Sequence, residues 1–225
     1  MPKIRTLKVV FDTPLKQYEI PAFRGAIVDL VGREDTTFHN HKGENGFHYR
    51  YPKIQYKAKQ GKAMIFCMEE GIEPLYQVFQ NSNQEINLNG KQIALNVEDI
   101  KLNQPFLQVW DKWMYYKITD WLPLNEKNFE RYITLDSEIE KLELLEKVLV
   151  GNILSMAKGL DWNIKNEVKV RITEKVAEKN ITFKNVKMKG MIVFFKSNVF
   201  LPAHIGIGKG ASIGHGVIHP QSSRN

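Results

Sequence analysis

The sequence of 225 residues lacks three features that would assign it to a specialised class of protein. It contains a single cysteine, Cys67, so no disulfide can form within the chain. It has no run of about 18 apolar residues, which excludes a membrane-spanning helix, and no proline- or serine-rich stretch that would mark a linker. We therefore expect a soluble cytoplasmic protein whose lone thiol, inside the apolar run Ala63–Met68, is buried and inert.

Basic and acidic residues are distributed unevenly along an otherwise ordinary globular composition. Hydrophobic residues make up 43% and charged residues 25%, which excludes a disordered or low-complexity chain. The net charge of +7 arises in residues 161–225, which hold 11 basic and 4 acidic residues, whereas residues 1–160 hold 21 of each. A second basic group lies between residues 45 and 68, where there is no acid. The pattern indicates a protein that binds a polyanion such as nucleic acid, with a solvated basic surface as the alternative.

The first part of the chain has the pattern of one βαββαβ unit. Residues 2–11 alternate as a strand, and Pro21–Val31 has apolar residues at helical spacing, with Gly32 just beyond its end. Tyr49–Ala58 alternates again, with Ile54, Tyr56 and Ala58 on the side opposite to Gln55 and Lys57. The remaining elements expected are a strand at Lys62–Met68, a helix at Glu69–Gln80 and a strand or strand pair at Glu85–Leu95. This order predicts a ferredoxin-like half over residues 1–98.

The second part, residues 99–225, is less regular. Phe106–Leu122 is expected to be extended or mixed, and Asp136–Lys158 has the clearest helical pattern in the chain, with Asp136 or Ser137 as its cap. A strand at 168–173, a turn at 177–180 and strands at 181–188 and 191–200 should follow. We predict an α+β fold of two ferredoxin-like halves packed side by side, the second irregular and without a clear second helix.

A loop expected at residues 33–48 carries the candidate chemistry. His39 and His41 are two apart, so both imidazoles point the same way in an extended stretch. Imidazole exchanges protons near neutrality, and cleavage of RNA by its own 2′-hydroxyl needs a base, an acid and a cation for the phosphorane, with no metal or other cofactor. The residues that follow, able to neutralise a phosphate or stack on a base, are Tyr49, Arg50, Tyr51, Lys53 and Lys57.

Two other interpretations of the histidine loop stay open. A His-x-His pair is also metal-ligand spacing, and His48 could supply a third ligand. Against a metal, nothing nearby supplies the Asp or Cys partners of common zinc hydrolase signatures. The remaining interpretation is three solvent-exposed histidines with no chemical role.

A glycine-rich segment lies near the C-terminus. It contains five of the 15 glycines within 11 residues, and backbone without Cβ atoms can approach a phosphate closely. A Walker P-loop is excluded because Lys209 is followed by Gly210 instead of Ser or Thr. Apolar residues recur too regularly for a mobile linker. The residues expected to contact RNA here are Gly206, Gly208, Lys209, Gly210, Gly214 and Gly216.

The segment G-I-G-K-G-A-S-I-G-H-G-V resembles the glycine-rich signature of CRISPR-associated repeat-processing endoribonucleases of the repeat-associated RNA-binding superfamily. The family usually has an aromatic residue between the last two glycines, where this chain has His215. The resemblance implies two ferredoxin-like halves and metal-independent cleavage of CRISPR repeat RNA that leaves a 2′,3′-cyclic phosphate and a 5′-hydroxyl. It also implies a catalytic histidine in the loop after the first helix, at His39 or His41, assisted by Tyr49 or Tyr51.

Two functions follow from these observations. The first is a metal-independent endoribonuclease for CRISPR repeat RNA, with His39, His41 and Tyr49 as catalytic residues. The alternative is a non-catalytic RNA-binding subunit of a CRISPR ribonucleoprotein, which has no need of paired proton carriers. Other effector subunits and a second copy of the chain are further partners compatible with either function.

Overall fold

The computed structural model describes residues 2–32, 51–80 and 85–222, and the chain divides into two compact units. The N-terminal unit contains Lys3–Pro105 together with Ser212–Gly214. The C-terminal unit contains Phe106–Ala211 and the residues from His215 on, with Pro2. Each unit is built on one four-stranded sheet, and the two are described separately below.

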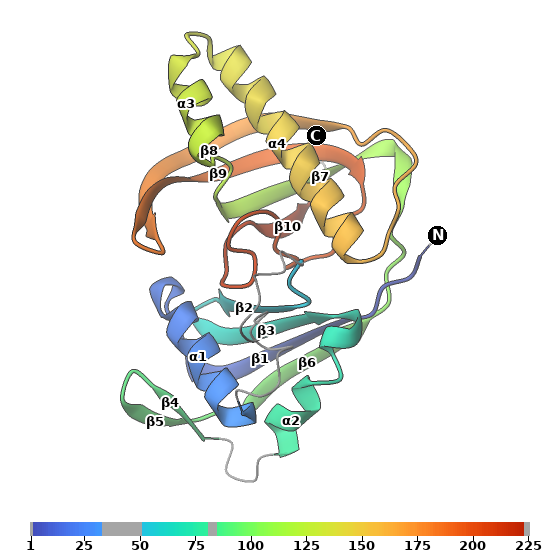
Figure 1. Ribbon diagram of the computed structural model, residues 1–225. Coiled ribbons are helices and arrows are strands. Elements are labelled where there is room, and N and C mark those ends of the chain that lie inside the picture. The colour runs from blue at the N-terminus through green and yellow to red at the C-terminus, as the bar shows by residue number, and fades with distance from the viewer. Residues whose placement is uncertain (1, 33–50, 81–84, 223–225) are drawn as a thin grey trace, which may run out of the picture. The chain divides into compact units, whose positions relative to one another are not determined.

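The N-terminal sheet has the strand order β2-β3-β1-β6, and all its neighbouring strands are antiparallel (Figure 1). Numbered along the chain within this unit, the four strands lie in the order 2-3-1-4, which is the ferredoxin-like order. The elements of the unit are β1 (Thr6–Pro14), a short 3₁₀ turn η1 (Gln17–Glu19), α1 (Ile20–Val31), β2 (Ile54–Lys59), β3 (Lys62–Met68), the 3₁₀ turn η2 (Glu69–Gly71), α2 (Leu75–Gln80), β4 (Glu85–Leu88), β5 (Lys91–Ala94) and β6 (Val97–Asn103).

The fourth strand of this sheet is β6, and the prediction that Glu85–Leu95 supplies it is wrong. That segment forms a separate hairpin, β4–β5, which turns at Asn89 and Gly90 with φ of 54° and 81°. β6 is an edge strand with every residue exposed, so it has no alternation of buried and exposed positions to reveal it. The N-terminal unit therefore continues through Pro105, past the boundary at residue 98.

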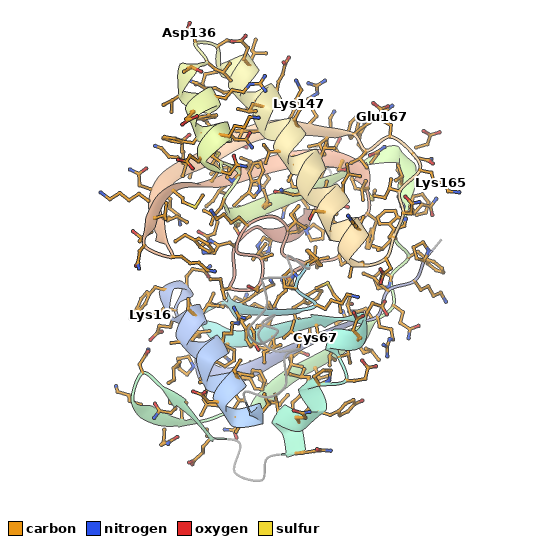
Figure 2. The ribbon with its side chains drawn as sticks, in the orientation of Figure 1. Lys16, Cys67, Asp136, Lys147, Lys165 and Glu167 are labelled. Carbon is orange, nitrogen blue, oxygen red and sulfur yellow. The ribbon has the colours of Figure 1, made fainter. Side chains whose placement is uncertain are left out.

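A hydrophobic core fills the space between this sheet and its helices. α1 contributes Phe23 and Ile27, both 0% exposed, which pack with Tyr56 of β2 and with residues of β1 and β3. Cys67 of β3 is also completely buried in this cluster (Figure 2), and burial raises the pKa of its thiol. The predicted burial of Cys67 is confirmed, and a buried thiol with a raised pKa is expected to be unreactive.

The C-terminal sheet has the order β10-β7-β9-β8, again the ferredoxin-like order with β7 as its first strand (Figure 1). A helix that the sequence did not reveal, α3 (Glu126–Thr134), precedes the predicted long helix, α4 (Glu138–Gly159). Ser137 caps α4, its Oγ accepting a hydrogen bond from the backbone N–H of Ile139 at 3.2 Å. The strands are β7 (Val109–Trp121), β8 (Val170–Phe183), β9 (Val186–Val199) and β10 (Val217–Gln221).

β8 and β9 form one long hairpin of two 14-residue strands, so the predicted turn at 177–180 and the division into three short strands are wrong. The turn lies instead at Lys184 and Asn185, which have φ of 49° and 65°. The register shifts near Glu174 and again near Ala177, which moves side chains between the faces and interrupts the alternation.

No helix connects β9 to β10 in the described chain, and residues 200–216 run there as turns and isolated bridges. None of the described helices is long and apolar enough to cross a membrane.

The buried stripe of α4 should dominate the stability of the C-terminal unit. Leu149 is 0% exposed, and Leu154 on the same helix is 43% exposed. Leu149→Ala should lower the free energy of unfolding by about 2–5 kcal/mol, because it leaves a cavity, and Leu154→Ala by less than about 1 kcal/mol. Urea unfolding followed by circular dichroism measures both, and equal losses would mean that the packed face of α4 is assigned incorrectly.

Candidate nucleic-acid interface

The histidine loop lies outside the described residues, so the structure does not place His39, His41, His48, Tyr49 or Arg50. Its two borders are described. α1 ends at Val31, followed by Gly32 with φ of 93°, and the chain is described again from Tyr51, three residues before β2. The predicted site residues whose geometry is known are Tyr51, Lys53, Lys57, Lys209 and the five glycines.

A chain of hydrogen bonds joins the start of β2 to its centre. The ammonium of Lys57 donates to Gln55 Oε1 at 2.8 Å. The amide nitrogen of Gln55 donates to Tyr51 Oη at 3.0 Å and to the carbonyl oxygen of Pro52 at 3.2 Å. Gln55 and Lys57 alternate with Ile54 and Tyr56, which belong to the hydrophobic core, so the predicted division of β2 into two faces is confirmed.

Lys57 is buried, which does not fit its predicted role as a residue that neutralises a phosphate. Lys57 is only 1% exposed, and its ammonium donates a hydrogen bond to a neutral amide, that of Gln55. Desolvation lowers the pKa of Lys57 to about 7. A lysine enclosed in this way cannot present its charge directly to a phosphate, but it can orient Gln55 and, through it, the hydroxyl of Tyr51.

Tyr51 is a neutral hydroxyl in this network. Burial raises its pKa, and the hydrogen bond from Gln55 opposes that shift only partly. Because Tyr51 Oη accepts from Gln55, its own hydrogen must point to another group. The network therefore holds Tyr51 in one orientation at the border of the histidine loop.

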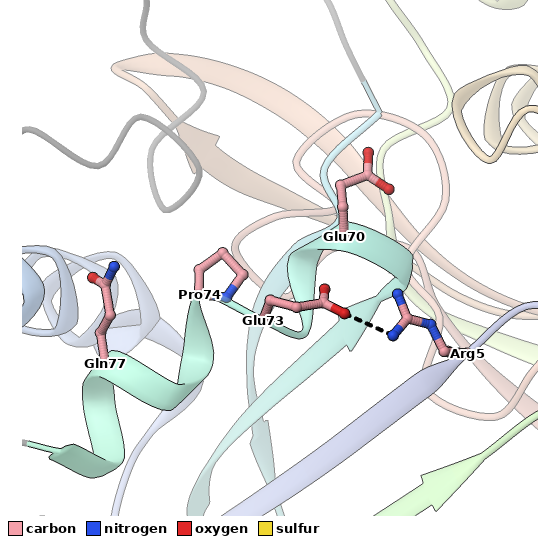
Figure 3. A pocket seen from close by; sticks show the side chains of 5 residues that line it. All are labelled: Arg5, Glu70, Glu73, Pro74 and Gln77. Atoms are coloured by element: carbon pink, nitrogen blue, oxygen red, sulfur yellow. Dashed lines mark hydrogen bonds and ion pairs between the residues drawn. The ribbon is translucent and has the colours of Figure 1, made fainter.

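Lys53 forms an ion pair with Glu70 of η2, and its side chain is only 16% exposed. Glu70 also lines a surface pocket of about 530 Å³ with Arg5, Glu73, Pro74 and Gln77 (Figure 3). Arg5 pairs with Glu73 at 2.6 Å in this pocket. The pocket holds two carboxylates and one guanidinium, so its net negative charge disfavours an anion. We therefore do not assign it to the nucleic-acid interface.

The glycine-rich segment is packed into the protein. Ile205 and Ile207 are 0% exposed, and Ile207 N–H donates to the carbonyl of Gly216 at 2.9 Å. Ser212–Gly214 belong to the N-terminal unit, where Tyr56 N–H donates to the carbonyl of Ser212 at 2.9 Å and Gln17 Nε2 donates to that of Gly214 at 2.9 Å. The expectation that the segment is not a mobile linker is confirmed.

Protein atoms occupy the space beside four of the five glycines. Gly208, Gly210, Gly214 and Gly216 all have positive φ, between 63° and 84°. A Cβ on Gly208 would lie 2.5 Å from Asn152 Oδ1, which accepts a hydrogen bond from Trp121 Nε1, and one on Gly216 would overlap the carbonyl of Ile207. The glycines are therefore required by the packing of the chain on itself.

Lys209 is the exposed cation of this segment. Its ammonium lies 5.6 Å from the centroid of the Phe183 ring. The backbone turns on either side of it, at Gly208 and Gly210, hold this position in the C-terminal unit. A role of the segment in RNA binding therefore depends on Lys209 and on backbone groups, whereas the glycine Cα atoms face protein.

The basic excess of the C-terminal part is partly neutralised. Lys179 pairs with Asp120 at 2.8 Å, and Lys189 pairs with Glu178 at 3.1 Å. Among the described residues, no ion pair involves Lys184, Lys187 or Lys196. The composition revealed the excess charge, but the lysines that keep it could not be identified without the contacts.

Two sequence models of known domains match this chain. The model of the Cas6b N-terminal domain matches residues 2–105, and the model of the Cas6b C-terminal domain matches residues 108–221. An uncharacterized protein of Methanocaldococcus jannaschii is 36% identical over 136 residues, which are 60% of this chain and 91% of that protein.

Solved structures agree with the domain models. A crystal structure of Cas6b has a TM-score of 0.89 and 29% identity, covering 97% of this chain and all of that one. A structure described as the CRISPR RNA processing endoribonuclease Cas6b has a TM-score of 0.74 and 26% identity over the same share of both chains. A type IV Cas6 crRNA endonuclease, Csf5, shares the fold with a TM-score of 0.59 and 11% identity.

Removing the ammonium of Lys57 should change how stability depends on pH. The folded protein loses this proton near pH 7 and the unfolded chain near pH 10.5, so between these values the unfolded chain binds one more proton. The free energy of unfolding of the wild type should rise with pH by up to ~1.4 kcal/mol per unit relative to Lys57→Met. Urea unfolding across that window measures the difference, and parallel curves would show that Lys57 is charged in the folded state.

Alanine at Gly216 should destabilise the protein, whereas alanine at Gly25 should not. Gly216 has a φ of 63° and its Cβ would overlap the carbonyl of Ile207, while a Cβ at Gly25 in α1 meets nothing within 4 Å. Gly216→Ala should lower the free energy of unfolding by at least about 1 kcal/mol. Gly25→Ala should raise it by roughly 0.5–1 kcal/mol. Thermal unfolding of the two variants decides, and an unchanged Tm for Gly216→Ala would refute the close contact.

Proposed function

Since the chain belongs to the Cas6b family, we propose that it is an endoribonuclease that cuts CRISPR repeat RNA. The observation that carries the proposal is the agreement of both halves, in sequence and in fold, with Cas6b, one structure of which is described as a CRISPR RNA processing endoribonuclease. The net charge of +7 supports binding to a polyanion. RNA is the partner that this reaction requires, while a second copy of the chain or other effector subunits are not needed for the chemistry.

The reaction proposed is an in-line attack of the RNA on itself. The 2′-oxygen forms a bond to the adjacent phosphorus, and the bond between that phosphorus and the 5′-oxygen breaks. One group removes the proton of the 2′-hydroxyl and another supplies a proton to the departing 5′-oxygen, so the products are a 2′,3′-cyclic phosphate and a 5′-hydroxyl. His39 and His41 are assigned jointly to these two roles, with Tyr49 as an orienting group or replacement acid and no metal.

The described residues at the border of the histidine loop support this site. Gln55 Nε2 donates to Tyr51 Oη and so holds the Tyr51 ring in one orientation at the border of this loop. Arg50 precedes Tyr51 in the sequence and is proposed to neutralise a phosphate, whereas the ammonium of Lys53 pairs with Glu70 and that of Lys57 donates to Gln55. In the C-terminal unit, the turns at Gly208 and Gly210 present Lys209, and Gly206 and Gly216 hold the segment in shape, while Gly214 packs within the N-terminal unit.

Substitution of the paired histidines tests the mechanism. His39→Ala and His41→Ala should each slow single-turnover cleavage of a labelled repeat RNA by ~10²–10⁴-fold and leave its Kd nearly unchanged, because each removes a proton carrier. His48→Ala, in the same loop, is the matched control and should retain activity. EDTA should have no effect, and an RNA with a 2′-deoxy sugar at the cut site should bind without being cut.

Three kinds of result would contradict the proposed mechanism or the proposed function. Cleavage of the deoxy substrate, or loss of activity with EDTA, would falsify the mechanism and favour a metal held by His39, His41 and His48. Full activity of the His39→Ala, His41→Ala double variant would move the site elsewhere, with His48 as the next candidate. Tight RNA binding without any cleavage by the wild type would favour a non-catalytic RNA-binding subunit.

A further inference from the structure

One face of the C-terminal sheet carries alternating aromatic and lysine side chains. On β7 and β9, Tyr116, Ile118, Val193 and Phe195 are at most 2% exposed and form the buried face of the sheet. The residues between them point to the other face of the sheet. We call this the lysine–aromatic face, and its members are Trp113, Tyr115, Lys117, Phe194 and Lys196.

The register of the two strands places each lysine beside a ring. Lys117 is directly opposite Phe194, and its ammonium lies 5.6 Å from the centroid of that ring. Lys196 is directly opposite Tyr115, and its ammonium lies 4.9 Å from the centroid of the Trp113 ring. The two lysine–ring pairs therefore lie along the same strands, at neighbouring positions of one face.

These lysines differ from others of the same sheet. Lys175, Lys179 and Lys189 form ion pairs with carboxylates of the C-terminal unit. Within the described ranges, Lys117 and Lys196 form no ion pair and are placed over rings. An ammonium over an aromatic ring is held in position without being neutralised, so this face keeps positive charge for an anionic partner.

The rings suit unpaired nucleobases. Trp113 is 41% exposed, so a base can reach its ring. Phe194 and Lys196 are two residues apart on β9, which places their Cα atoms ~7 Å apart along the strand, so a ring and a positive charge lie side by side. Single-stranded RNA is commonly bound by aromatic side chains on the face of a four-stranded antiparallel sheet, with bases stacked on the rings and lysines near the phosphates. The C-terminal sheet has four antiparallel strands, with one face of β7 and β9 buried and the other partly exposed.

We propose that the lysine–aromatic face binds a single-stranded segment of the RNA substrate, with bases stacked on Trp113 and Phe194 and phosphates near Lys117 and Lys196. The proposal rests on the proposed function, because it assumes that RNA is the substrate. When a base stacks on Trp113, Lys196 moves from the ring to a phosphate, so no charge is left without a partner. A second copy of the chain fits less well, because two such faces would bring unneutralised lysines together.

Removal of the rings tests the proposal. Trp113→Leu and Phe194→Leu should each raise the Kd for an unstructured single-stranded repeat RNA by roughly 5- to 150-fold, because a stacking partner is lost. Trp113→Tyr and Phe194→Tyr keep a ring and should retain most of the affinity. Phe129→Leu is the matched control, since Phe129 is 38% exposed but lies on α3. Fluorescence anisotropy with labelled RNA measures each Kd, and a fully paired RNA of the same length should bind all variants alike.

Two further measurements keep the test decisive if a leucine variant is poorly folded. Binding of single-stranded RNA should quench the tryptophan fluorescence of the wild type, and most of that quenching should be absent in Trp113→Tyr. The Lys117→Gln, Lys196→Gln variant should flatten the dependence of log Kd on log salt by ~0.7 per lost contact.

Other outcomes separate this proposal from the proposed function. Unchanged affinity of the leucine variants in a protein that still cuts repeat RNA would overturn the stacking surface and leave the nuclease intact. If the wild type binds RNA through these rings but does not cut it, the stacking surface is supported and the proposed nuclease activity is overturned. A shift from dimer to monomer in Trp113→Leu, with RNA affinity unchanged, would assign the face to a second copy of the chain.

Discussion

Backbone turns that only glycine tolerates well shape the C-terminal part of this protein. At Gly208, Gly210, Gly214 and Gly216 the chain has positive φ and passes close to other protein atoms. These turns let one segment take the place of the helix that would otherwise connect β9 to β10. The same segment adds Ser212–Gly214 to β2 of the N-terminal unit and then returns as β10 to complete the C-terminal sheet. A glycine-rich signature thus serves the fold itself.

Electrostatics in the two units follow different principles. In the N-terminal unit Lys57 is enclosed and desolvation lowers its pKa to about 7, so its role is to orient Gln55 and Tyr51 at the border of the histidine loop. In the C-terminal unit Lys117 and Lys196 keep their charge over rings. The first arrangement suits a reacting site, where a donor must be held in one orientation. The second suits a binding surface, where charge and stacking hold a flexible strand.

Local patterns predicted the elements whose packing is visible in their own sequence. β3 was predicted at Lys62–Met68 and has those bounds, and α1 and α4 differ from their predicted bounds by two residues or fewer at each end, because each has a continuous apolar stripe or run. β6 was missed because an exposed edge strand has no such pattern. The β8–β9 hairpin was misread because its register shifts imitate a turn. The family resemblance compensated for these errors, since the signature identified the fold that the elements alone described incompletely.

Some features of the candidate site could likewise be predicted from local sequence, and others could not. Residue types and spacing sufficed to select the histidine loop, the glycine segment and the uneven positive charge, because those signals are local. They could not reveal that Lys57 is enclosed, that protein atoms fill the space beside Gly208 and Gly216, or that Lys117 lies opposite Phe194. Each of these facts depends on contacts between residues far apart in the chain. Whether a lysine is a surface charge, a buried hydrogen-bond donor or a cation over a ring is set by its neighbours in space, which only the folded chain brings together.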